Sequence, residues 1–76
     1  MTTKYRIILN DDEQFELYKD RVYVSTEQWV GDHLLKIAYE HHVPTGDCQY
    51  ESQLLFKLNQ YGSQVHTNNF QIEVPM

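Results

Sequence analysis

Cysteine is nearly missing from this chain, and its scarcity limits how the fold can be stabilised. Cys48 is the only cysteine among 76 residues, so no disulfide can form within the chain and packing must stabilise the fold. Long apolar runs are missing too, because no stretch approaches the roughly 20 apolar residues of a membrane span. Residues 1–5 also lack the apolar region of a signal peptide. We therefore expect a cytoplasmic protein that does not associate with membranes.

Basic residues are the second scarcity. Six Lys and Arg stand against eleven Asp and Glu, which gives a net charge of -5, and the six are dispersed along the chain. Such a surface repels phosphate backbones, so direct nucleic-acid binding is not expected. The ten aromatic residues (six Tyr, three Phe and one Trp) are better explained as core. Each buries on the order of 150–250 Å², which compensates for the short chain.

The sequence also lacks the residue combinations that make an active site. Nothing places Cys48 or a serine beside a base and an orienting acid, so neither enzyme activity nor a cofactor is expected. A metal-binding domain remains an alternative through the four histidines and Cys48. Its spacing is poor, because His33 and His41 are about two helical turns apart and the neighbours His41 and His42 diverge by about 100°. We therefore predict no metal site.

Short β-branched and aromatic runs predict strands near both ends of the chain. Residues 5–9 and 14–19 form the first two, and they are expected to pair antiparallel. Residues 21–24 also favour a strand, either as a bulged continuation of the second or as the return arm of another hairpin. After a loop at 64–69, residues 70–74 alternate apolar and polar side chains and predict a closing strand.

The longest predicted element is a helix that begins near Thr26 and ends at Val43. Ser25 and Gln28 have the spacing of a capping box at its start, and Pro44 ends it, because the residue before a proline avoids helical geometry. The predicted packing stripe comprises Val30, Leu34, Ile37, Ala38 and His41, and the predicted water-facing i, i+4 series comprises Asp32, Lys36 and Glu40.

The segment from Tyr50 to Tyr61 fits two elements. As a short helix it presents Leu54, Leu58 and Tyr61 on one face, with Ser52 as N-cap and Gly62 as stop. As a strand it presents Leu54, Phe56 and Leu58. The sequence leaves both alternatives open.

Together these elements predict one α+β domain over residues 1–76. An antiparallel or mixed sheet of three to four strands carries one long helix across one face. In size and element order this is similar to the β-grasp architecture of ubiquitin-like domains, particularly if residues 54–58 form a strand. Such a resemblance of pattern does not fix function.

A second apolar ridge runs along the predicted helix, away from its packing stripe. It comprises Gly31, Leu35, Tyr39 and His42. Gly31 costs roughly 1 kcal/mol relative to Ala inside a helix, a cost better tolerated where another backbone approaches closely. Either the ridge packs under the segment from Tyr50 to Tyr61, or it is exposed and binds a partner. In the second case Trp29 and Tyr39 are the expected anchors, since large aromatics dominate interface energetics.

These features predict a small acidic protein that binds a larger protein or protein complex and regulates or inhibits it. Compact acidic chains of this kind occur among phage and mobile-element proteins that block a host machine, which would place the chain in the host cytoplasm. The alternatives are a constitutive accessory subunit of an enzyme complex and the metal-binding domain. Homodimerisation is also open if residues 70–74 form an edge strand, although Pro75 partly blocks such growth.

Overall fold

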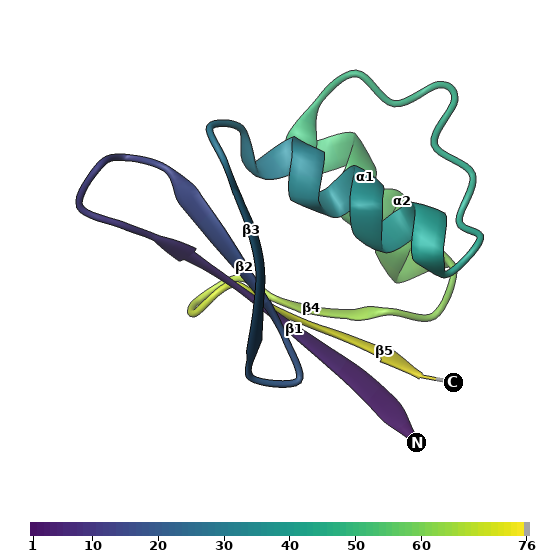
Figure 1. The fold of residues 1–76 in the computed structure, drawn as a ribbon. Coiled ribbons are helices and arrows are strands. Elements are labelled where there is room, and N and C mark those ends of the chain that lie inside the picture. The colour runs from purple at the N-terminus through teal and green to yellow at the C-terminus, as the bar shows by residue number, and fades with distance from the viewer. Residues whose placement is uncertain (76) are drawn as a thin grey trace.

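The computed structural model describes residues 1–75, which form a five-stranded sheet with two helices on one of its faces (Figure 1). The strands are β1 (Thr2–Leu9), β2 (Phe15–Lys19), β3 (Val22–Glu27), β4 (Gln64–His66) and β5 (Gln71–Pro75), and the helices are α1 (Val30–Glu40) and α2 (Glu51–Gln60). The predicted α+β class, with a helix packed across one face of a small sheet, is confirmed. None of the helices in residues 1–75 has the length and apolar character needed to cross a bilayer.

The strand order is β3-β2-β1-β5-β4, and every neighbouring pair is antiparallel. The sheet has five strands instead of three or four because Gln64–His66, predicted to be loop, pairs with β5. A run of three residues is too short for alternation to reveal a strand. The closing strand β5 lies between β1 and β4, so it is not an edge strand. A homodimer formed by pairing of residues 70–74 would require an edge strand there.

A tight hairpin joins β2 to β3. Residues 21–24 are therefore part of its turn and return arm, and they are not a bulged continuation of the second strand. Its two-residue turn consists of Asp20 and Arg21, with positive φ values of 49° and 71°, as a type I′ turn requires. Asp20 also extends the pairing with β1. Its N–H donates to the Lys4 carbonyl oxygen at 2.7 Å, and its carboxylate accepts from the Lys4 N–H at 3.0 Å.

The start of α1 differs from the prediction. Ser25 and Thr26 lie in β3 and pair with β2, so the capping box predicted there is wrong. Pairing with β2 engages backbone groups that a helix start would use, and the β-branched run from Val22 favours that pairing. The helix begins at Val30, and its N-cap, Trp29, makes no side-chain capping bond.

The polar side of α1 also differs from the prediction, because two of its three charged residues bond to the sheet. Lys36 Nζ donates to the Ser25 hydroxyl at 2.8 Å. Glu40 accepts a bond from Lys19 Nζ at 3.0 Å. Asp32 and Glu40 are nevertheless exposed, as predicted, and Lys36 is half-buried.

The packing stripe of α1 is confirmed. Val30, Leu34, Ile37 and Ala38 are buried, and His41 is half-buried at the boundary. They pack in one core with residues of the sheet and of α2. The sheet contributes Tyr5, Ile7, Leu17, Ile72 and Val74, and α2 contributes Leu54 and Leu58. Burying one such aliphatic side chain contributes about 1.5–3 kcal/mol, so this shared core is the main source of stability.

The segment from Tyr50 to Tyr61 is helical, which settles the open alternative. Its N-cap is Tyr50, not Ser52, and the Gln53 side-chain oxygen accepts from the Tyr50 N–H at 2.9 Å. Gly62 follows the helix at φ 100°, a left-handed conformation that favours glycine after a helix end. Residues 54–58 are helical, so the strand that would have strengthened the resemblance to a β-grasp arrangement does not form.

The connection between the helices is longer than predicted, because α1 ends at Glu40 and not at Val43. His42 has a φ of 58° and turns the chain out of the helix. The connection then runs back along the helices, so that α1 and α2 point in the same general direction (Figure 1).

Candidate functional site

The structure divides the predicted second ridge of α1 into a packed part and an open part. Gly31 is buried, and Leu35 is half-buried against the core. Tyr39, by contrast, is 86% exposed, and His42 is exposed beside it. The first half of the ridge is therefore covered and the second half is exposed.

Trp29 accounts for the glycine in this ridge. A Cβ built on Gly31 would lie 2.3 Å from Cζ2 of the Trp29 indole, which is far inside van der Waals contact. The group that approaches Gly31 is therefore a side chain two residues away, and not a second backbone. The Trp29 indole covers Gly31 and remains 42% exposed.

Other exposed aromatic residues lie on the helix layer with Tyr39. They are Tyr50 and Tyr61 at the two ends of α2, and Phe56, which is 68% exposed in its middle. Sequence reasoning did not single these out as a surface, because the outward face of residues 50–61 depends on whether they form a helix or a strand. Only the 3.6-residue period of a helix could have indicated this surface, because it places Leu54 and Leu58 on one face and Phe56 on another.

A polar cluster joins the C-terminal end of α1 to the sheet. The Tyr5 hydroxyl lies 2.7 Å from Glu40 Oε2 and 2.7 Å from His41 Nε2, and Lys19 Nζ lies 3.0 Å from the same Glu40 oxygen. Since a hydroxyl has one proton, Tyr5 donates to the carboxylate and His41 Nε2–H donates to Tyr5. Sequence reasoning missed this cluster because Tyr5 and Glu40 are 35 residues apart.

The electrostatics of this cluster favour a structural role. Burial raises the pKa of the Tyr5 phenol, and the bond to the Glu40 carboxylate raises it further. The same bond, together with Lys19, holds the pKa of Glu40 below its usual range despite partial burial. The phenol stays neutral and the carboxylate stays ionised near pH 7, so the cluster fastens the end of α1 to β1 and β2.

Three of the histidines, His33, His41 and His66, each contact a different partner. His33 is fully buried, with Nε2 2.7 Å from the Phe15 carbonyl oxygen and Nδ1 unpartnered. His41 bonds to Tyr5, and His66 lies 3.3 Å from Glu73. In the part of the chain that the structure describes, no three His, Cys, Asp or Glu side chains are grouped to hold a metal ion.

The face of the sheet opposite the helices is open. Strand register places one residue from each strand in a row across it, namely Tyr23, Tyr18, Arg6, Gln71 and His66. Directly paired residues point to the same face, and the neighbouring core residues face the helices. At about 4.8 Å per strand, this open-face row spans about 19 Å.

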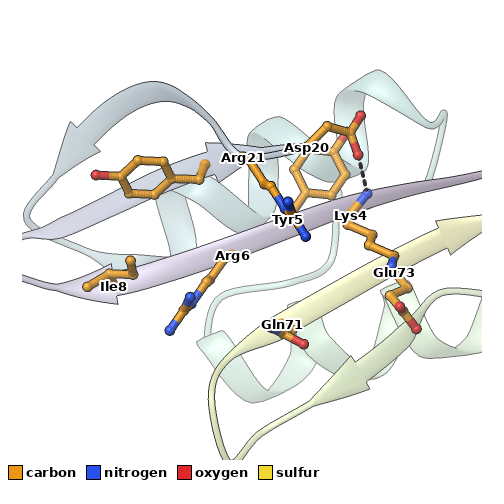
Figure 2. A pocket seen from close by; sticks show the side chains of 9 residues that line it. Lys4, Tyr5, Arg6, Ile8, Asp20, Arg21, Gln71 and Glu73 are labelled. Carbon is orange, nitrogen blue, oxygen red and sulfur yellow. Dashed lines mark hydrogen bonds between the residues drawn. The ribbon is translucent and has the colours of Figure 1, made fainter.

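A shallow hollow of about 600 Å³ lies on this open face (Figure 2). Lys4, Arg6 and Arg21 lie around it, together with the acidic residues Asp20 and Glu73 and with Tyr18 and Ile8. These three cations make up half of the six Lys and Arg in the chain. The lining of the hollow thus carries three cations and two carboxylates, on a protein that is acidic overall.

Comparison with models of known protein families, with curated proteins and with solved structures finds no match to this chain. Function must therefore be argued from these surfaces.

Proposed function

We propose that this chain is a protein-binding module that regulates or inhibits a larger macromolecular machine through its helix layer. The observation that supports the proposal best is Tyr39, which is 86% exposed on the last turn of α1. Its side chain makes no hydrogen bond or ring contact with another described residue, whereas the side chains of Tyr5, Tyr18 and Tyr23 each do.

The neighbouring aromatic residues strengthen this proposal. A single exposed aromatic needs no explanation, but Tyr39 shares the helix layer with Tyr50, Phe56 and Tyr61, all more than half exposed. Aromatic side chains are enriched among the residues that carry most of the energy of an interface. A partner would bury these rings at low entropic cost, because each has only two side-chain torsions.

The test is affinity capture from a lysate of the organism that encodes the chain, with wild type compared with Tyr39→Asp. Gln60→Asp is the matched control, because it adds the same charge at an exposed position of α2 and removes no aromatic ring. A partner that is bound by the wild type and by Gln60→Asp and is lost with Tyr39→Asp supports the helix-layer surface. Circular dichroism confirms that both variants fold.

Regulation is tested separately with the purified partner. We expect its activity to fall when the wild-type chain is added and to remain unchanged with Tyr39→Asp. A partner retained by Tyr39→Asp would contradict the assignment of the surface. Unchanged activity on binding would contradict regulation and favour a constitutive accessory subunit.

A further inference from the structure

The open face of the sheet carries three cations that form no ion pair within residues 1–75, beside the carboxylates of Asp20 and Glu73. Lys4, Arg6 and Arg21 are all exposed, and within residues 1–75 none of them has an ion pair. Of the other basic residues, Lys19 is paired with Glu40 and Lys36 bonds to Ser25. Lys57, on α2, has neither an ion pair nor a side-chain hydrogen bond among the described residues. Three of the four cations without such a partner therefore lie on the face that the helices leave uncovered.

The carboxylates of the same face are already engaged. Glu16 accepts bonds from the Tyr18 hydroxyl at 2.9 Å and from Asn10 Nδ2 at 3.2 Å. Glu73 lies 3.3 Å from His66 Nε2, and the Asp20 carboxylate accepts from the backbone N–H of Lys4 in β1. An incoming anion therefore meets cations without internal partners, beside acids that already have them.

Apolar contact surface lies beside these cations. The rings of Tyr18 and Tyr23 meet edge to face with their centroids 5.8 Å apart. Their hydroxyls are bonded to Glu16 and Thr26, which holds both rings in place. Ile8 lines the hollow from β1. A ligand that combines acidic and apolar groups would satisfy both features without rearrangement of the face.

We propose that the open face binds an extended acidic segment of a partner protein. The carboxylates of this segment pair with Arg6, Lys4 and Arg21, and the apolar side chains of the segment cover Tyr18 and Tyr23. The row spans about 19 Å, which matches about six residues of extended peptide. A nucleic acid fits less well, because its phosphates recur at every nucleotide, whereas a peptide can place carboxylates opposite the cations and uncharged side chains opposite Glu16, Asp20 and Glu73. This surface is distinct from the helix layer and does not depend on Tyr39.

The test is selection of random peptides of about twelve residues, displayed on phage, against the full chain. Enriched peptides are synthesised and their affinity is measured by fluorescence anisotropy for the wild type, Arg6→Gln and Lys57→Gln. Lys57 lies on α2 away from the hollow, so its variant makes the same change in net charge elsewhere. Arg6 is exposed, and thermal melting confirms that its variant stays folded.

We expect the enriched peptides to be rich in Asp and Glu and to shift backbone amide NMR signals of the open-face row. Arg6→Gln should weaken their binding about tenfold, as loss of one charged hydrogen bond predicts, and Lys57→Gln less than about twofold. Tyr39→Asp should leave this binding unchanged, so failure here is separate from failure of the helix-layer proposal. The proposal is overturned if no peptide is enriched or if the enriched peptides lack acidic residues. It is also overturned if Arg6→Gln and Lys57→Gln lose peptide affinity equally, or if a single-stranded oligothymidylate binds more tightly than the peptides.

Discussion

Replacing Tyr5 with Phe tests whether the cluster at the end of α1 stabilises the fold. The ring is 2% exposed and would stay buried, so the change removes only the hydroxyl and its contacts of 2.7 Å to Glu40 and 2.7 Å to His41. A hydrogen bond to a charged group contributes about 1.5–3 kcal/mol. Because Glu40 is partly exposed and water can replace one bond, we expect the free energy of unfolding to fall by about 2 kcal/mol.

Urea and thermal unfolding measure this loss directly. For a domain of this size, about 2 kcal/mol corresponds to a fall in Tm of about 8–16 °C. Tyr18→Phe is the matched control, since the Tyr18 hydroxyl also donates to a carboxylate, at 2.9 Å to Glu16, but on the open face. That variant should lose less stability than Tyr5→Phe, because water can replace the bond there.

The pH dependence gives a second check with a definite sign. The pKa of Glu40 is lower in the folded chain than its ordinary value of 4.5, so folding favours the ionised carboxylate. This contribution is present above that value and is lost as the pH falls through the folded pKa. The stability difference between wild type and Tyr5→Phe should therefore shrink below about pH 4.5. A difference that stays constant down to pH 3, or one below about 0.5 kcal/mol at pH 7, would refute the reasoning.

Three further substitutions test local features of the fold. Gly31→Ala should displace the Trp29 indole and shift the fluorescence emission of this single tryptophan to the red. The free energy of unfolding should change by less than about 1 kcal/mol, because the higher helix propensity of alanine offsets the lost packing. Unchanged emission would contradict the contact between Trp29 and Gly31. Arg21→Gly should raise the free energy of unfolding by about 0.5 kcal/mol, since glycine adopts positive φ without a steric cost, and a loss in urea unfolding would count against the type I′ turn. His33→Ala should cost about 2–4 kcal/mol by leaving a cavity and removing the bond to the Phe15 carbonyl; a loss below about 1 kcal/mol would show that the site collapses without cost.

Predictions from the sequence succeeded where one element's pattern was enough. The alternation around Ile72 and the stripe through Leu34 and Ile37 each identify an element and its buried face, and both are confirmed. They failed where pairing with a distant segment competed with a local signal. Ser25 has the chemistry of a helix cap, yet pairing with β2 keeps it in a strand. Residues 64–66 become a strand only because β5 lies beside them.

The candidate surfaces show the same limit. Tyr39 could be singled out from sequence because helical periodicity places it away from the packing stripe. The cluster around Tyr5 and the open-face row could not, since both depend on strand register and on the crossing of α1. The row joins Tyr18, Arg6 and Gln71, which are far apart in the chain and are brought together only by pairing of β1 with β2 and β5.

The distribution of charge shows why net charge alone is a poor guide to the partner. The six basic residues look dispersed in sequence, and a net charge of -5 argues against binding anions. Folding ties Lys19 and Lys36 to internal partners and leaves Lys4, Arg6 and Arg21 around one hollow. A short acidic ligand responds to this local charge, while the net charge acts over distances that salt screens beyond about 10 Å. Binding at the open face should therefore weaken as salt is added, whereas binding through Tyr39, which buries an uncharged ring, should change little.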